Sequence, residues 1–134
     1  MPKEHINPKE LFNSLQYGFS QIVTSQGGKT VHMSGQVAWD SDQQIVGKND
    51  LRKQTRQALK NVETAVNAAG GTLTDVVSMR IYFVFDKLDE TGSISSGLKE
   101  FFPGNQPPAT TWIGVHSLAR EDFLIEIEAI AVIE

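Results

Sequence analysis

Two glutamates, Glu126 and Glu128, stand two residues apart in an otherwise apolar C-terminal segment, residues 123 to 133. If that segment is a strand, both carboxylates leave the same face, about 7 Å apart along the strand. Carboxylates in an apolar row need a partner or a task. Arg80, in another strand-like segment, is the obvious ion-pair partner. The alternative is catalysis, with one carboxylate in a partly dry cleft orienting or deprotonating a water molecule. The two interpretations are compatible, with one glutamate paired and the other catalytic.

Other residue types that bind metals or attack substrates are scarce. The chain has no cysteine, which removes disulfides, thiolate nucleophiles and cysteine-based zinc sites. The three histidines, His5, His32 and His116, fall in a start expected to be flexible, a strand and a turn. Because their spacing is not that of metal ligands, we expect no metal site.

Positive charge follows one predicted helix, where Arg52, Arg56 and Lys60 are four residues apart. A solvated helix face is the favoured interpretation, and an RNA-binding ridge is the alternative. No aromatic residue is interleaved on the stripe for bases to stack on. The net charge of −4 also opposes a polyphosphate partner. We therefore expect no nucleic acid partner.

The elements that must position these residues can be read along the 134-residue chain, which has the length of one domain, residues 1–134. Two apolar, β-branched segments flank Gly27 and Gly28 and predict a hairpin. Two segments have helical spacing, and the first has a candidate N-cap at Asn49 or Asp50 and a stop at Gly70. The predicted strands are residues 19–25, 30–38, 76–85, 109–115 and 123–133, and the predicted helices are residues 50–69 and, more weakly, 88–102.

This order predicts an α+β fold in which two helices cover one face of a sheet. The other face would carry side chains too apolar for water, which predicts an oligomer. No apolar run reaches the ~18 residues of a membrane span, and the N-terminus lacks a signal-peptide core. We therefore expect a cytoplasmic protein without a membrane partner. The residues assigned to the uncovered face are Tyr82, Val84, Trp112, Ile130 and Val132.

Several short segments, in order along most of the chain, resemble the Rid (YjgF) family. The most specific is the closing run IEIEAIAV from residue 125 to residue 132. The others are the MSGQ segment at residues 33–36, AAGG at 68–71, DVV at 75–77, the Phe101-Phe102 pair and PPA at 107–109.

The resemblance implies a chorismate-mutase-like fold, a mixed sheet backed by two helices on one face. It also implies a homotrimer with small-molecule clefts between subunits. Family members of the RidA type hydrolyse reactive imines and enamines released by pyridoxal-phosphate enzymes, and they use no cofactor of their own. A similar deaminase activity, cofactor-independent, is therefore the first function to consider.

The resemblance also assigns site residues. Glu126 matches the family's acidic residue near the reacting water, Gly35 the glycine whose backbone lines the cleft, and Tyr17 the aromatic residue at its mouth. Ser95 stands where RidA-type members commonly have asparagine, and Thr110 stands where they have the arginine that grips the substrate carboxylate.

Thr110 changes the expected substrate. A guanidinium gives a carboxylate two charge-assisted bonds, whereas a threonine hydroxyl gives one neutral donor. Losing a buried charge partner costs about 3–5 kcal/mol, so we expect poor hydrolysis of small anionic 2-imino acids unless Arg80 or Arg120 replaces the missing group. Two function classes stay open, a hydrolase of imine-like substrates and a non-catalytic trimeric binding or regulatory module. Ribonuclease activity fits the acidic charge balance less well.

Overall fold

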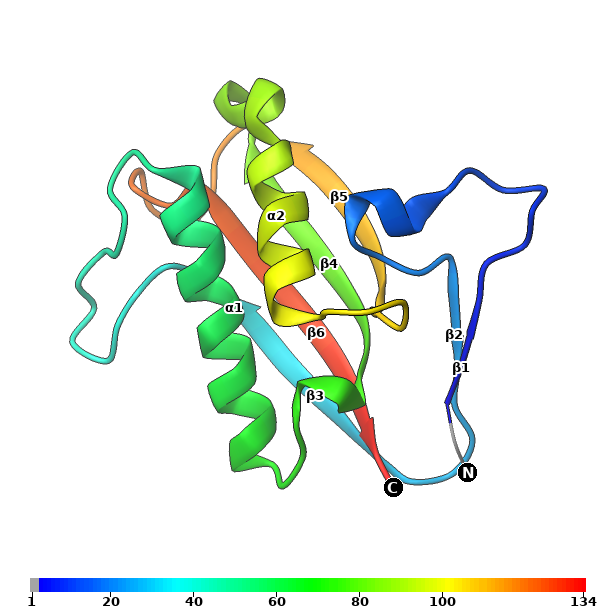
Figure 1. The fold of residues 1–134 in the computed structure, drawn as a ribbon. Helices are drawn as coiled ribbons and strands as arrows, with labels where there is room; N and C mark the ends of the chain where they lie inside the picture. Colours follow the sequence, from blue (N-terminus) through cyan, green and yellow to red (C-terminus); the bar gives the residue numbers. More distant parts are fainter. Residues whose placement is uncertain (1–2) are drawn as a thin grey trace.

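The computed structural model describes residues 3–134 as a four-stranded sheet, a two-stranded ribbon and two main helices (Figure 1). The strands are β1 (Glu4–Ile6), β2 (Ile22–Thr24), β3 (Lys29–Gln36), β4 (Val76–Val84), β5 (Ala109–Val115) and β6 (Ile125–Ile133). The helices are α1 (Leu51–Ala68) and α2 (Gly92–Phe101), with short 3-10 turns η1 (Ser14–Tyr17), η2 (Leu73–Asp75) and η3 (Phe85–Glu90).

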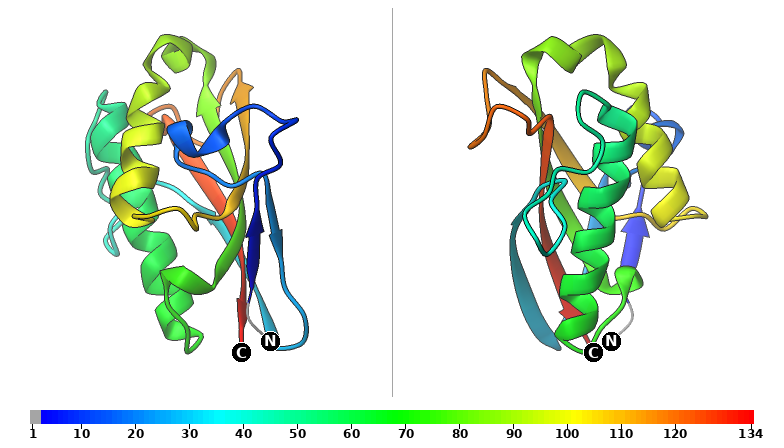
Figure 2. Two further views of the ribbon diagram at one scale, coloured as in Figure 1. Left: turned by 45° about the vertical axis from the view of Figure 1, so that its right-hand side comes forward. Right: turned by 90° about the vertical axis from the view of Figure 1, so that its left-hand side faces the viewer.

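The main sheet has the order β3-β6-β4-β5. β6 pairs antiparallel with both of its neighbours, whereas β4 and β5 are parallel. A parallel pair needs a crossover, and α2 provides it. Both helices pack on one face of the sheet, as the side views in Figure 2 show. The predicted mixed sheet backed by two helices is therefore confirmed.

Helix α1 begins and ends where its capping residues predict. The Asp50 side chain accepts a hydrogen bond of 3.0 Å from the Lys53 amide, so Asp50 is the N-cap rather than Asn49. Gly70 follows the helix with a φ of +97°, a left-handed conformation that ends it. The buried stripe of α1 includes Leu59, Val62 and Val66 and packs against the sheet.

Alternation along β4 and β6 builds the other side of this core. Met79, Ile81, Ile125 and Ile127 are almost completely buried beneath the helices. The residues between them, Glu126 included, point to the opposite, helix-free face of the sheet. The sequence alternation thus separates an apolar face from a face that carries carboxylates.

A buried glutamine on α1 fixes the chain where it enters β6. The Gln54 side chain donates to the carbonyl oxygens of Gly47 and Asp122 at 3.1 Å and 2.9 Å. It also accepts a hydrogen bond of 2.9 Å from the Leu124 amide. These bonds hold the start of the strand that carries the two glutamates.

The predicted hairpin across Gly27 and Gly28 is wrong. Both glycines have positive φ and do turn the chain, but β2 pairs with β1 while β3 pairs with β6. The start of the chain is therefore a strand rather than a flexible segment, with His5 opposite Val23. A glycine turn shows where a chain reverses and leaves open which strand it joins.

Two further expectations need correction. Trp112 lies opposite Ile81 in the parallel register, so it faces the helices and packs against the core instead of lying on the uncovered face. The second helix begins at Gly92, because residues 85–90 form the separate turn η3. Within residues 3–134, no helix has the length and apolar character needed to span a membrane.

Candidate functional site

A pocket of about 410 Å³ opens beside β5, between η1 and the first turn of α2. We call it the aromatic pocket. Three of the residues that the resemblance assigned to the site, Tyr17, Ser95 and Thr110, meet here although they come from three different elements. The complete lining is Tyr17, Phe19, Thr91, Gly92, Ser95, Thr110 and Trp112.

The floor of the aromatic pocket is built by alternation along β5. Thr110 and Trp112 are two residues apart and share one face, and the indole Nε1–H of Trp112 donates to Thr110 Oγ1 at 2.9 Å. The Phe19 ring lies 5.8 Å from the Trp112 ring and completes the wall. Sequence reasoning missed both aromatic residues, although the two-residue spacing from Thr110 was a signal for Trp112.

The mouth of the pocket depends on a glycine. Gly18 ends η1 with a φ of +95°, and a Cβ there would lie 2.9 Å from Leu98 Cβ of α2. Only glycine combines that backbone conformation with such a close approach. This packing holds Tyr17, which is 45% exposed, beside the helix.

A second group, which we call the acidic edge, consists of Gly35 on β3 and Glu126 on β6. The β3–β6 ladder shifts register between Met33 and Gln36, the signature of a β-bulge. A Cβ on Gly35 would overlap the Glu126 carboxylate, so the glycine backbone and this side chain are in direct contact. Glu126 makes no ion pair with any residue in the range 3–134.

The aromatic pocket and the acidic edge are separate in one chain. Thr110 pairs with Met79 and faces the helices, whereas Glu126 pairs with Tyr82 on the opposite face. They also lie on different strands, since Glu126 on β6 is two strand spacings, roughly 10 Å, from β5, and Gly35 on β3 is one spacing further away. The expectation that Thr110 and Glu126 line one cleft therefore requires two copies of the chain, and it stays a prediction.

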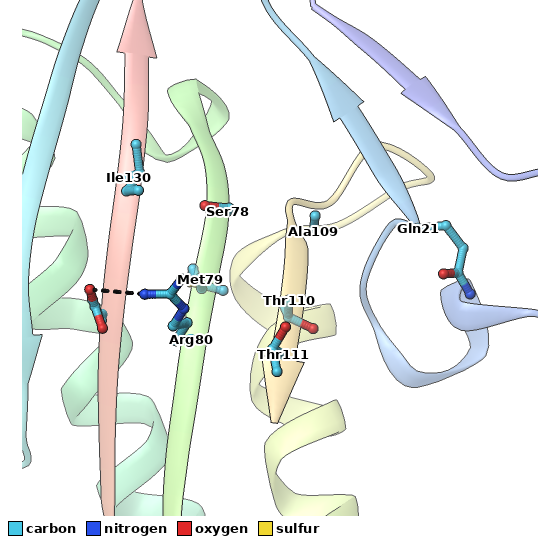
Figure 3. Close-up of a pocket in the computed structure, with 9 residues that line it drawn as sticks. Gln21, Ser78, Met79, Arg80, Ala109, Thr110, Thr111 and Ile130 are labelled. Carbon is cyan, nitrogen blue, oxygen red and sulfur yellow. Dashed lines mark ion pairs between the residues drawn. The ribbon is translucent and has the colours of Figure 1, made fainter. Parts of the chain in front are cut away.

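Glu128 has the ion-pair partner that the sequence predicts. Arg80 Nη1 lies 3.8 Å from Glu128 Oε2, across the β4–β6 ladder (Figure 3). Tyr82 adds a hydrogen bond of 3.2 Å from its hydroxyl to Glu128 Oε1. The Arg80 side chain is 64% exposed, so solvent screens the pair strongly.

Neither arginine considered as a substitute anchor lines the aromatic pocket. Arg80 borders a shallow pocket of about 280 Å³ on the helix-free face, together with Thr111 and Glu128 (Figure 3). The Arg120 guanidinium lies 5.8 Å from the centre of the Trp39 ring, at a different groove. The lining of the aromatic pocket therefore contains no guanidinium, although Thr110 also borders the pocket that Arg80 lines.

The remaining charged groups include the acidic and histidine side chains and the basic stripe of α1. Residues 3–134 contain no cluster of three or more histidine or acidic side chains that could hold a metal ion. On the basic stripe of α1, Arg56 makes a bidentate ion pair with Glu100 of α2, at 2.9 Å to 3.1 Å. This pairing interrupts the stripe and favours the solvated-face interpretation.

The structure defines a class of α+β domain, with a mixed sheet, two helices on one face and a small pocket beside the edge strand. The comparison with known proteins makes the class specific. A family model described as endoribonuclease L-PSP matches residues 13–133. The chain belongs to this family, which is the Rid (YjgF) family.

Three relatives illustrate the match. A crystal structure of the Rid-family protein YyfB from Yersinia pestis, described as of unknown function, superimposes with a TM-score of 0.93 at 39% identity and covers 99% of this chain and 100% of that chain. A 2-iminobutanoate/2-iminopropanoate deaminase of Dermatophagoides farinae is 33% identical over 116 residues, 87% of this chain and 86% of the relative. TdcF of E. coli, solved with bound serine, has a TM-score of 0.70 at 31% identity, covering 83% of this chain and 85% of that chain.

Proposed function

We propose that the protein is a homotrimeric hydrolase that deaminates imine-like or enamine-like small molecules without a cofactor. The single observation that carries the proposal is the contact between Gly35 and Glu126, which holds an unpaired carboxylate against a bare backbone. A relative named as an imino-acid deaminase, 33% identical over most of its length, supports the same reaction class.

The reaction needs little more than a positioned water and a proton carrier. Water adds to the carbon of a C=N bond while the nitrogen takes up a proton, and the resulting carbinolamine releases ammonia and leaves a carbonyl compound. A carboxylate beside the reacting carbon orients the water and accepts its proton. Glu126 suits this role because, within residues 3–134, no cation neutralises it.

The two separated groups support a site shared between copies. The aromatic pocket adjoins the β5 edge, and the acidic edge lies at the β3 side of the same sheet. A head-to-tail contact sets one edge of a copy against the other edge of its neighbour, and three such contacts close a ring. Each cleft would then receive Thr110 from one subunit and Glu126 from the next.

The test combines assembly and turnover. Light scattering should give a trimer, and the wild-type protein should accelerate the hydrolysis of an uncharged imine, which lacks the carboxylate that Thr110 disfavours. Glu126→Gln should lower that acceleration by about 10²–10⁴-fold with little change in melting temperature. Glu128→Gln, on the same face two residues away, is the matched control and should keep most of the turnover. A monomer, or full turnover in Glu126→Gln, contradicts the proposal.

A second candidate is a trimeric small-molecule-binding or regulatory module without turnover. The observation that favours it is the neutral hydroxyl of Thr110 at the position where the resemblance expects an arginine. This candidate predicts that ligands bind in the cleft with no acceleration of imine decay, and with equal affinity in the wild type and in Glu126→Gln.

A further inference from the structure

We propose that the aromatic pocket selects uncharged ligands that carry a flat ring and a neutral hydrogen-bond acceptor. This inference rests on the proposed function, because it names the ligand class of the same cleft. Its first support is the wall of the pocket. Tyr17, Phe19 and Trp112 supply three aromatic side chains to a lining of seven residues.

These rings belong to a connected aromatic cluster. Phe19 lies 5.8 Å from Trp112 at an interplanar angle of 53°, and Phe12 lies 6.2 Å from Phe19 and 6.4 Å from Tyr17. Contacts of this kind favour a further ring, stacked or edge-on, over an aliphatic chain of similar size. The cluster therefore selects for the shape of the ligand.

The absence of charged side chains from the lining of the pocket also favours an uncharged ligand. None of its seven lining residues is an Asp, Glu, Lys, Arg or His, and its polar side chains are hydroxyl groups and one indole. A carboxylate entering this pocket would lose water without gaining a cation. An uncharged ligand avoids that penalty.

The hydrogen bonds available in the pocket come from hydroxyl groups. Trp112 already donates its indole proton to Thr110 Oγ1, which leaves the hydroxyl proton of Thr110 free to donate to a ligand. The hydroxyls of Thr91 and Ser95 make no hydrogen bond within the described part of the chain, residues 3–134. Neutral donors of this kind suit a carbonyl oxygen or a ring nitrogen. Thr110 thus positions the indole and contacts the ligand.

Three probes separate ring selection from charge selection. They are benzamide, which is flat and neutral, benzoate, which is flat and anionic, and cyclohexanecarboxamide, which is neutral and not flat. Binding to the assembled protein is measured by isothermal titration calorimetry for the wild type and for each variant, and the indole N–H signal of Trp112 in NMR spectra of the wild type reports whether a probe enters the aromatic pocket.

Benzamide should bind roughly tenfold or more tightly than benzoate and roughly fivefold more tightly than cyclohexanecarboxamide, and it should shift the Trp112 signal. Thr110→Arg should reverse the preference between benzamide and benzoate. Trp112→Leu should remove the preference for the flat ring, and Trp112→Phe should keep it, which separates loss of the ring from misfolding.

Equal or tighter binding of benzoate to the wild type would overturn the inference, as would the absence of ring selection. Failure of all three probes to bind, as expected if a side chain of a neighbouring copy fills the pocket, would also overturn it. These outcomes are independent of turnover. Ring-selective binding with no effect of Glu126→Gln on turnover would overturn the proposed hydrolysis alone, whereas Glu126-dependent turnover with no ring selection would overturn this inference alone.

Discussion

The two candidate parts of the site differ in nearly every physical respect. The aromatic pocket is uncharged, is built from side chains of η1, α2 and β5, and lies on the side of the helices. The acidic edge is a carboxylate against a glycine backbone, on the helix-free face of β3 and β6. One part is suited to holding a ligand and the other to moving a proton. If both parts belong to one site, as we propose, the complete site depends on assembly.

Strand geometry explains how such different surfaces arise from neighbouring residues. Thr110 faces the aromatic pocket, while Thr111, the next residue, lies opposite Arg80 on the other face. A shift of one residue in the register of β5 would exchange these two environments. The two faces of β5 therefore carry different surfaces, although the residues that form them are neighbours in the sequence.

The largest expected effect comes from mixed trimers in which one subunit lacks the carboxylate of the acidic edge and its neighbour lacks a wall of the aromatic pocket. Glu126→Gln removes the carboxylate and Trp112→Ala removes the pocket wall, so each variant alone should lose nearly all turnover. Trimers refolded from an equal mixture should recover about a quarter of the wild-type turnover, because that fraction of clefts takes an intact part from each neighbour. The measurement is imine decay before and after mixed refolding. No recovery would mean that each chain builds its own site.

A smaller defect at the acidic edge should affect catalysis without affecting the fold. In Gly35→Ala, the new methyl group displaces the Glu126 carboxylate, which is the far end of a flexible side chain. Since a shift of about 1 Å costs about 10²-fold in rate, turnover should fall by that order while the melting temperature changes little. Ligand binding in the aromatic pocket should persist.

The matched control for that glycine is Gly114→Ala on β5. A Cβ at Gly114 meets Phe83 at 3.5 Å, an ordinary van der Waals contact. This variant should keep both turnover and stability. Equal losses in Gly35→Ala and Gly114→Ala would show that strand glycines matter for folding alone.

Glu128→Gln should have a modest effect, in contrast to Glu126→Gln. The exposure of Arg80 and the 3.8 Å separation of the pair place its contribution at about 0–1 kcal/mol. Urea unfolding of both variants measures the difference. A loss of about 3 kcal/mol or more would show that assembly buries the pair between copies.

The smallest expected effect concerns pH and the aromatic side of the molecule. Burial lowers the pKa of His5, the charge of Lys3 lowers it further, and His5 Nδ1 is buried without a hydrogen-bond partner. The unfolded chain, with a His pKa of about 6.5, therefore takes up the proton first. The stability linked to neutral His5 is present above that pH and is lost as the pH falls through it toward the lower folded pKa.

Melting temperatures measured between about pH 7.5 and about pH 5.5 should fall more in the wild type than in His5→Gln. His5 lies on the β1–β2 ribbon, which leads into Ser20, whose amide donates to Pro108 O at 3.0 Å beside β5. If protonation of His5 loosens the β1–β2 ribbon, it should therefore disturb the aromatic pocket before the acidic edge. An identical pH dependence in both proteins would assign the effect to other groups.

Local signals predicted the parts of the fold that depend on local physics. Helix α1 followed from its apolar period, a capping aspartate and a glycine stop, and β6 followed from strict alternation. The pairing of β2 with β1 did not follow, because a turn at Gly27 and Gly28 does not specify the partner strand. The side of the sheet on which Trp112 lies depends on its register with β4. Because β4 is apolar along nearly its whole length, the sequence does not show which of its residues Trp112 lies beside.

The candidate site also has a part that the sequence indicated and a part that depends on how the strands pair. Tyr17, Ser95 and Thr110 were assigned by resemblance and do share a pocket, whereas Phe19 was not singled out and Trp112 was assigned to the uncovered face. The separation of Glu126 from Thr110 follows from the strand order β3-β6-β4-β5. Strand order is a long-range property that no short motif records.

The bulge beside Gly35 also bears on solubility at high concentration. β3 is an edge strand of the main sheet, and such an edge is a template on which foreign strands add. The break in register after Met33, together with Lys29 at the start of the strand, leaves only a short charged stretch for a regular ladder. The feature that seats a carboxylate should therefore also hinder fibril growth, and a strain overproducing the protein should tolerate it without inclusion bodies.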